Sequence, residues 1–322
     1  MIIYLEDILK ATLTLLNMKF KTIGSDPEFF VLDDKGVAYP ATPFAKGSKE
    51  NPSSIGDGFF EQQDNLSFEG NVPPSETKEE FIFNITKLKQ YFADKVSKFN
   101  YSISNNGVEY FSKRYLMLPE AGDFGCSNVV SSWDSSTSGI IERPTPSLAD
   151  YKFRVSGFHI HIGYSYSKNI PKHLMDIIIG RLFDLFLTLP CELIHFERER
   201  VNTYGAYGII RSKDYGVECR ALSTFFTQPK YLPFVWDQLM KIEKFINNTS
   251  EKDLTSLVNR SMMIFSKDRL LMRFQDIFSK FRDKEVLQLF NETKNINNET
   301  SSKIILNDFN IIIAEYYKSN SI

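Results

Sequence analysis

Charged and histidine side chains alternate with other residues in four short segments of the chain, and in three of them they form pairs spaced two residues apart. The pairs are acidic in the first segment, histidine in the third and Glu-x-Arg in the fourth, while a single glutamate alternates with apolar residues in the second. Residues two apart in a β-strand point to the same face of the sheet. If the four segments are strands of one sheet, its open face collects Asp26, Glu28, Glu69, His159, His161, Glu218 and Arg220.

Such a face would need bound cations, because like charges held close together repel and partly buried carboxylates lose hydration. Mg²⁺ and Mn²⁺ take hard oxygen ligands with some imidazole, and they commonly bridge to substrate phosphates. Zn²⁺ fits less well, since the histidines are two apart on a strand and no cysteine spacing joins them. Four acids and up to two histidines therefore indicate two or more Mg²⁺ or Mn²⁺ ions.

Simpler interpretations of the same residues stay open. An Asp-x-Glu pair on a strand is most often a solvated face, and one of the two strand histidines could bond a backbone carbonyl instead of a metal. Glu218 and Arg220 could form an ordinary surface ion pair, which stabilises little.

Basic residues gather just before the fourth segment, around the sequence Tyr-Gly-Ala-Tyr-Gly that starts at Tyr204. Arginine suits bidentate recognition of phosphate or carboxylate. Arg211 is the best candidate, whereas Arg198 and Arg200 lie in a Glu-Arg-Glu-Arg run typical of a solvated surface. The chain has no GxxxxGK[ST] and no GxGxxG, which excludes P-loop and Rossmann sites.

The patterns around these residues predict the strands that position them. Alternating apolar residues and turn signals predict strands over residues 22–32, 65–71 and 154–164, and a strand-turn-strand over 205–226 with its turn at 213–216. We expect a hairpin turn at 33–36 before a short strand at 37–39, and a loop over 40–63. The strand over 65–71 is expected to end at Pro73-Pro74.

Helical spacing predicts the other elements. Helices are expected over residues 5–18, after a capping box that begins at Thr77, and from Pro171 to just before Pro190. From about residue 230 onward the chain is predicted to be helical. Hairpins and helices without regular βα alternation indicate an α+β fold, with an antiparallel sheet and helices on one face. We expect a catalytic domain over residues 1–228 and a mainly helical region over 229–322, packed on the core or extending it.

The composition sets broad limits on function. The 322 residues include 38 Lys+Arg and 40 Asp+Glu, a net charge of −2, so nothing points to nucleic acid or an anionic membrane as partner. The hydrophobic fraction of 42% is that of a globular protein. No apolar run reaches the roughly 18–20 residues that span a bilayer, and Glu6 and Asp7 interrupt the place of a secretory signal. Three widely spaced cysteines without CxxC suggest a reduced, cytoplasmic protein.

Three of these segments, taken in order, resemble a known family. Gly24–Phe30, Gly157–Gly163 and Tyr204–Ser223 look like the phage-encoded carboxylate–amine ligases, or amidoligases, of the glutamine synthetase/glutamate–cysteine ligase fold. The resemblance covers about residues 22–227. It implies a curved antiparallel sheet of the glutamine-synthetase catalytic type and ATP-dependent formation of an amide through an acyl phosphate.

The resemblance also implies roles for individual residues. Mg²⁺ or Mn²⁺ would be held by Asp26, Glu28, Glu69, Glu218 and one of the two strand histidines, with His159 the expected ligand. Arg211 and Arg220 would act on the transferring phosphoryl group. The expected contacts of ATP are Arg211, Arg220, Lys213, Arg200 and His161. The acid and amine substrates are not specified by the sequence, and a homo-oligomer is left open.

Two other functions remain as alternatives. A phosphotransferase of the same fold, like the guanidino kinases, would transfer the phosphoryl group without forming an amide. A non-catalytic phage accessory protein would keep the fold and bind a partner through its helical C-terminal third. The full set of carboxylates, histidines and arginines favours an enzyme.

Overall fold

The computed structural model describes residues 17–122, 129–135, 139–143, 151–166 and 170–247, together with residues 249 and 254. The chain divides into two compact units, Met1–Ile264 and Phe265–Ile322, and every described residue lies in the first. The helix expected over residues 5–18 lies almost entirely outside the described residues, as does most of the region expected to form a helical second part. The division at residue 228 therefore stays a prediction.

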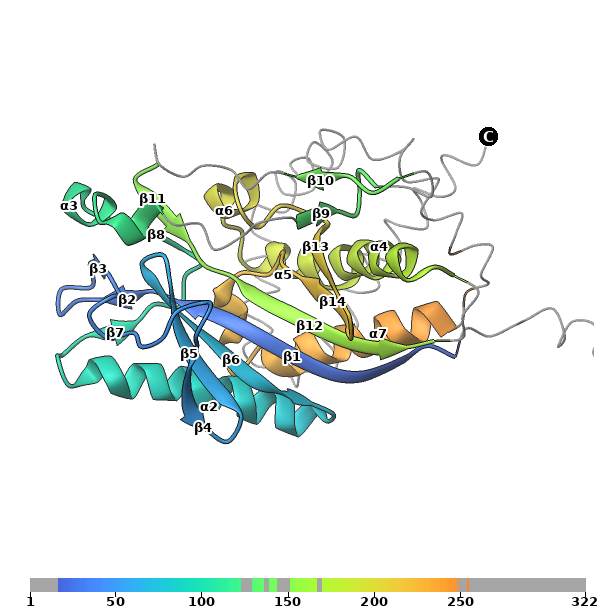
Figure 1. The fold of residues 1–322 in the computed structure, drawn as a ribbon, viewed down its shortest axis with the longest axis horizontal. Coiled ribbons are helices and arrows are strands. Elements are labelled where there is room, and N and C mark those ends of the chain that lie inside the picture. The colour runs from blue at the N-terminus through green and yellow to red at the C-terminus, as the bar shows by residue number, and fades with distance from the viewer. Residues whose placement is uncertain are drawn as a thin grey trace, which may run out of the picture. The chain divides into compact units, whose positions relative to one another are not determined.

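The largest sheet among the described residues has nine strands in the order β10-β9-β13-β14-β12-β1-β6-β5-β4, and every neighbouring pair is antiparallel (Figure 1). Its strands are β1 (Lys19–Phe29), β4 (Ser53–Gly56), β5 (Phe59–Asp64), β6 (Ser67–Ser75), β9 (Val129–Ser131), β10 (Glu142–Arg143), β12 (Phe158–Ser165), β13 (Ile209–Lys213) and β14 (Gly216–Cys219). The predicted antiparallel sheet in a mixed α and β fold is confirmed.

Two smaller sheets flank the large one. One pairs β2 (Val31–Leu32) with β3 (Ala38–Tyr39) and β7 (Ser102–Ile103), and the other pairs β8 (Val108–Tyr110) with β11 (Phe153–Val155). The pairing of β2 with β3 confirms the hairpin expected at residues 33–36.

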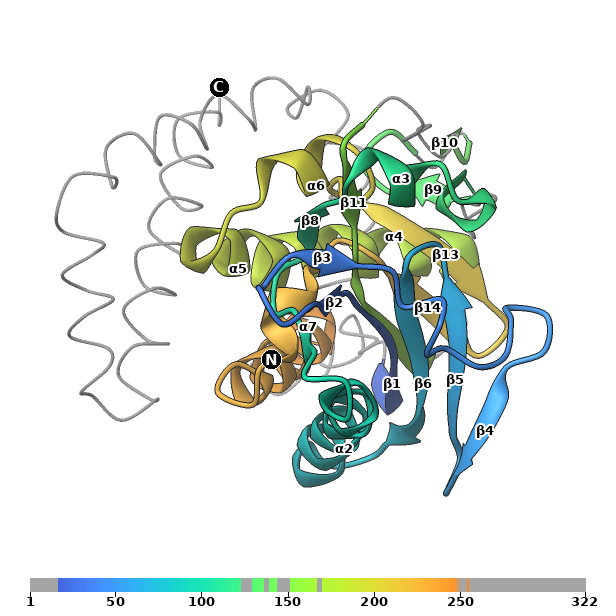
Figure 2. The same cartoon turned by 90° about the vertical axis from the view of Figure 1, so that its left-hand side faces the viewer.

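Helices cover one face of the large sheet (Figures 1 and 2). The helices within the described residues are α2 (Lys78–Ser97), α3 (Lys113–Leu116), α4 (Lys172–Phe183), α5 (Leu189–Ile194), α6 (Arg198–Asn202) and α7 (Leu232–Asn247). A π-helical turn, Asp184–Thr188, joins α4 to α5, and 3₁₀ turns occupy Pro119–Gly122 and Thr224–Thr227. Buried residues of α2, α4 and α7 form one core with apolar residues of β1, β12 and β14. Helix α7 therefore belongs to the same folded unit as the sheet.

The approach of α2 to the sheet depends on a glycine. A Cβ at Gly70 would lie 2.7 Å from a methyl carbon of Leu88 and 2.9 Å from the ring of Phe92, so only glycine lets the helix come this close to β6. The helix begins as predicted, because Thr77 accepts from the Glu80 amide and Glu80 accepts from the Thr77 amide. This packing fixes the position of β6, whose Gly70 faces the helix while the neighbouring Glu69 faces the open side of the sheet.

The structure corrects four element predictions. The loop expected over 40–63 contains β4 and β5. Strand β6 runs through Pro73-Pro74 to Ser75, where an irregularity in its pairing with β1 accommodates the prolines. The strand expected over 154–164 is two strands, β11 and β12, and the helix continues beyond Pro190, which lies in the first turn of α5.

No described helix has both the length and the apolar character needed to cross a membrane. Cys191 and Cys219 are buried free thiols, and Cys126 lies outside the described residues.

Candidate functional site

The strand register brings side chains from distant parts of the sequence into rows across the sheet. Arg211 on β13 lies opposite Glu218 on β14, which lies opposite His161 on β12. In the next row, Asp26 on β1 lies opposite His159. A third row joins the far strands, where Gln62, Glu69 and Glu28 lie opposite one another on β5, β6 and β1.

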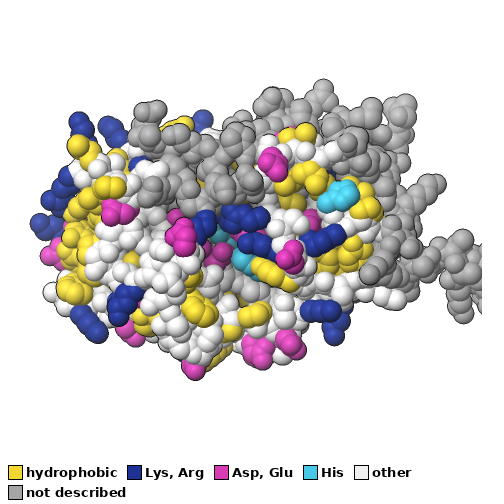
Figure 3. All heavy atoms as spheres, in the orientation of Figure 1, with side chains coloured by type: hydrophobic (Ala, Val, Ile, Leu, Met, Phe, Trp, Pro, Cys, Tyr) yellow, Lys and Arg dark blue, Asp and Glu magenta, His cyan; other side chains and the backbone are white. Residues whose placement is uncertain are grey.

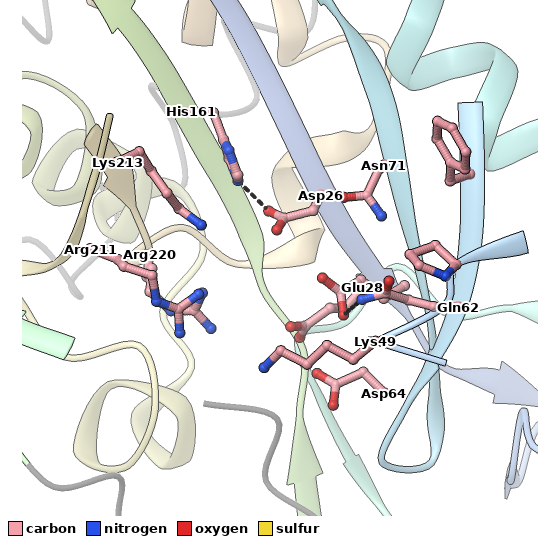
Figure 4. Close-up of a pocket in the computed structure, with 13 residues that line it drawn as sticks. Asp26, Glu28, Lys49, Gln62, Asp64, Asn71, His161, Arg211, Lys213 and Arg220 are labelled. Atoms are coloured by element: carbon pink, nitrogen blue, oxygen red, sulfur yellow. Dashed lines mark hydrogen bonds and ion pairs between the residues drawn. The ribbon is translucent and has the colours of Figure 1, made fainter. Parts of the chain in front are cut away.

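These rows border a cavity of about 400 Å³ on the face of the sheet away from the helices. That volume is within the range of small-molecule sites. Figure 3 shows basic side chains gathered at the centre of this face beside acidic and histidine ones. Figure 4 shows the lining residues, which are Asp26, Glu28, Lys49, Pro52, Phe60, Gln62, Asp64, Glu69, Asn71, His161, Arg211, Lys213 and Arg220.

One side of the cavity is a basic wall, which we define as Arg211, Lys213 and Arg220 (Figure 4). All three side chains converge on Glu218, which is fully buried behind them: Arg211 Nη1 and Lys213 Nζ lie 3.2 and 2.9 Å from Glu218 Oε2, and Arg220 Nη1 pairs with Oε1. Burial alone would raise the pKa of Glu218, but the charge of Arg220 above all lowers it to about 2. Glu218 is therefore an anion that holds three cations together.

The opposite side is an acidic wall, which we define as Glu28, Asp64 and Glu69. Burial and the charges of neighbouring carboxylates raise the pKa of Glu69 well above its ordinary value, and burial also raises the pKa of Asp64. Glu69 Oε2 accepts from the Gln62 amide at 2.7 Å, and Glu28 Oε2 accepts from the Gly157 backbone amide at 2.7 Å. These bonds orient the carboxylates without neutralising them.

Asp26 lies between the two walls, in contact with both strand histidines. Its Oδ1 is 3.3 Å from His159 Nδ1 and 3.0 Å from His161 Nε2. Burial alone would raise the pKa of Asp26, but the two rings lower it well below its ordinary value. Burial and the charge of Arg220 lower the pKa of His159 to about 4, so this ring is neutral near pH 7 and able to bind a metal.

The donor atoms of this face fit divalent cations. Among the described residues, two groups each offer three ligand atoms within 4.8 Å of one another: Asp26, His159 and Glu218 in one, and Glu28, Asp64 and Glu69 in the other. The contacts around Asp26 are close but not aligned as hydrogen bonds, so Asp26 Oδ1 and both nitrogens of His159 are buried without a hydrogen-bond partner. A cation would satisfy these atoms and would relieve the repulsion within the acidic wall.

The structure brings nine of the ten residues predicted from the sequence to this site. Asp26, Glu28, Glu69, His161, Arg211, Lys213 and Arg220 line the cavity, while His159 and Glu218 lie directly behind it in contact with lining residues.

Arg200 has a different place from the ATP contact that we expected. It is 2% exposed, and its guanidinium donates to the backbone carbonyls of Ser156, Arg220, Ala221 and Leu222. It therefore ties α6 to the ends of β11 and β14. The Glu-Arg-Glu-Arg pattern around it is typical of a surface, and it carried no signal for this buried role.

Sequence analysis missed Lys49, Asp64 and Gln62, which fall in or next to the region interpreted as a loop. Lys49 occupies the tip of a tight turn in which Ser48 and Asn51 exchange backbone hydrogen bonds of 3.1 Å. Figure 4 shows its side chain extending across the cavity toward the basic wall. The alternation of residues 59–64, once recognised as a strand, would have placed Gln62 and Asp64 on the same face.

Comparisons with known proteins place this chain only loosely. No family model and no curated protein matches it. Among solved structures, it is similar to a novel glutamine synthase homolog, with 10% sequence identity, a TM-score of 0.33, and coverage of 87% of this chain and 72% of that one.

Proposed function

We propose that this protein is an ATP-dependent carboxylate–amine ligase of the glutamine synthetase fold, akin to the amidoligases, that uses Mg²⁺ or Mn²⁺. The observation that carries the proposal is the cavity itself. Two walls of opposite charge, built from five strands, face each other across a space of about 400 Å³. A polyphosphate with its cations is complementary to this distribution, because its phosphates would face the basic wall and its cations the acidic wall.

Each wall has a role in the proposal. Asp26, His159 and Glu218 would hold one divalent ion, and Glu28, Asp64 and Glu69 another. The ions would neutralise charge on the phosphates of ATP. Arg211, Lys213 and Arg220 would bind phosphate oxygens, since guanidinium groups suit this geometry. Because Glu218 already pairs with these three cations, it would hold them in position before the nucleotide arrives.

The proposed reaction has two steps. An oxygen of the substrate carboxylate attacks the γ-phosphorus of ATP, and ADP leaves. The amine nitrogen then attacks the acyl carbon, inorganic phosphate leaves, and the nitrogen loses a proton. Positioning and charge stabilisation account for most of the catalysis in phosphoryl transfer. Arg220 is 2% exposed, so its charge acts in a site with little water and stabilises the phosphoryl group more strongly than a surface charge would.

Nucleotide binding is the first test. We expect the wild-type protein to bind a non-hydrolysable ATP analogue in the presence of Mg²⁺ by calorimetry, and Glu28→Gln to lose most of that affinity. Asp237→Asn is the control, because it removes a carboxylate of the same charge that pairs with Lys78 on the surface. Equal affinity in Glu28→Gln and the wild type would reject the metal assignment.

Product analysis separates the proposal from its alternatives. A ligase releases ADP and phosphate in equal amounts when a suitable acid and amine are both present. ADP without phosphate would instead identify a phosphotransferase. A wild-type protein that binds no nucleotide at all would be a non-catalytic member of the fold.

A further inference from the structure

Tyr215 has no role in the proposed reaction, yet it touches the site. It lies in the turn between β13 and β14 and is 51% exposed. Its carbonyl oxygen accepts from the backbone amide of Tyr164 on β12, at 3.2 Å. This bond joins the turn to the strand that carries His161, and so it fixes the position of the tyrosine beside that histidine.

The side chains of Tyr215 and His161 form a close pair. The phenol oxygen is 2.6 Å from His161 Nδ1, and the two rings lie at an interplanar angle of 16° with their centres 6.2 Å apart. On the other side of the imidazole, Nε2 is 3.0 Å from Asp26 Oδ1. Figure 4 shows this second contact. Both ring nitrogens of His161 therefore face atoms of the protein.

The chemistry of the two partners fixes the direction of this chain. The contact of His161 Nε2 with Asp26 is a close charge contact rather than an aligned hydrogen bond. An ionised carboxylate can only accept, so it favours a proton on the nitrogen that faces it. When the ring is neutral, Nδ1 is then the acceptor and the Tyr215 hydroxyl is its donor; when the ring is protonated, Nδ1 donates to the phenol oxygen instead. Without that hydroxyl, the contact with Asp26 alone would hold the ring, and Nδ1 would lose its partner in this pair of contacts.

We infer that Tyr215 is a positioning residue, which orients His161 and through it the metal-binding carboxylate of Asp26. The inference rests on the proposed function for the metal and refines it in one respect. His161 was expected to contact ATP, whereas its two nitrogens here connect an exposed tyrosine to Asp26. Partners of this kind typically change metal affinity about 10–100-fold when they are removed.

The first test measures the ring itself, without metal. The chain has four histidines, so selective ¹⁵N-histidine labelling gives a simple NMR spectrum, which His161→Gln assigns. Tyr215→Phe is expected to shift the His161 nitrogens and leave those of His173 and His195 unchanged. His159 is left out of this comparison because it also contacts Asp26. Tyr110→Phe is the matched control. Tyr110 is also an exposed tyrosine, at 58%, and its hydroxyl donates to Glu199 at 3.0 Å rather than contacting a histidine. Unchanged His161 signals in Tyr215→Phe would overturn the inference.

The second test measures binding of Mn²⁺ alone by electron paramagnetic resonance. We expect the dissociation constant to rise at least about 10-fold in Tyr215→Phe and to stay at the wild-type value in Tyr110→Phe. Altered His161 signals with unaltered Mn²⁺ affinity would show that the ring is oriented but does not position Asp26, which overturns that step. A wild-type protein that binds no Mn²⁺ would reject the metal site of the proposed function and, with it, the inference that His161 positions Asp26 as a metal ligand. The NMR result would still decide whether Tyr215 orients His161.

Discussion

The two walls of the cavity contain buried carboxylates with opposite electrostatic character. On the basic side, Glu218 is fully buried, and the charge of Arg220 leads the lowering of its pKa to about 2. On the acidic side, Glu69 is also buried, but burial and neighbouring carboxylates raise its pKa well above the ordinary value. Burial is common to both carboxylates, so the neighbouring charges decide whether the pKa is lowered or raised.

This difference has a functional meaning. In the basic wall each cation already has an anion beside it, because Arg211, Lys213 and Arg220 all contact Glu218. With three positive charges to one negative charge, this wall keeps an excess of positive charge. The acidic wall has the opposite imbalance, because it gathers three carboxylates with Gln62 and Lys49 beside them. Proteins pay for such an arrangement in stability, and a binding site for cations is the explanation that fits the rest of the cavity.

The largest effect is expected from breaking the basic wall. Glu218→Gln leaves the buried charge of Arg220 without its anion, and removing one member of a buried ion pair typically costs about 3–5 kcal/mol. The free energy of unfolding, measured in urea, should fall by that amount at pH 7. Since the folded pKa lies below the ordinary 4.5, this stabilisation is present above pH 4.5 and is lost as the pH falls toward 2.

The exposed ion pair of Asp237 with Lys78 supplies the control. Asp237→Asn should change the free energy of unfolding by less than about 1 kcal/mol. A Glu218→Gln protein as stable as Asp237→Asn would mean that Glu218 does not hold the basic wall together.

The next largest effect is expected when a cation is added to the acidic wall. At a Mn²⁺ concentration 100 times its dissociation constant, the wild-type protein should gain about 2.7 kcal/mol of stability, because only the folded state binds the ion. Asp64→Asn should lose most of this gain, and Asp237→Asn should keep it. Thermal unfolding with Mn²⁺ and with EDTA provides the measurement; an equal gain in Asp64→Asn would exclude Asp64 as a ligand.

The sequence predicted the centre of this site better than its edges. Strand alternation alone placed Asp26 with Glu28 and His159 with His161 on shared faces, because the period of two is a local property of the chain. The capping box at Thr77 was equally local and equally correct. What the pattern could not supply was the order of the strands, since β1 pairs with residues of β6 that are 39 to 52 positions away and with residues of β12 that are 131 to 146 positions away.

The edge of the site was missed for a related reason. Residues 40–63 are rich in Gly, Pro, Ser and Asn, which is typical of a loop, yet five of the six residues of β5 pair with β6. Tertiary pairing therefore overrode weak local preference. Arg200 shows the reverse error, because a charged run that predicts a surface is here buried against four carbonyl groups.

The third prediction concerns the pH dependence of the acidic wall. Where a folded carboxyl has a raised pKa, it stays protonated after the unfolded chain has ionised, so stability falls as the pH rises above the ordinary value of 4.5. Glu69→Gln cannot ionise and can still accept from Gln62. In EDTA at pH 8 it should be more stable than the wild type by about 1 kcal/mol, a sign opposite to that of Glu218→Gln. If the free energies of unfolding of Glu69→Gln and the wild type changed in parallel from pH 5 to 8, the raised pKa of Glu69 would be contradicted.

The smallest effect is expected from Lys49, which among the described residues is the lysine or arginine that lines the cavity outside the basic wall. Its charge lowers the pKa of Asp64, against the larger effect of burial, so Lys49 partly offsets the repulsion within the acidic wall. Lys49→Met should therefore leave stability unchanged at pH 5 and reduce it by about 0.5 kcal/mol at pH 8 in EDTA. Lys46→Met, on the same loop but away from the cavity lining, should show no such dependence on pH. Because Mn²⁺ would replace the missing charge, the difference between the two variants should disappear when the ion is added. A difference that persists in Mn²⁺ would mean that Lys49 stabilises its loop rather than the acidic wall.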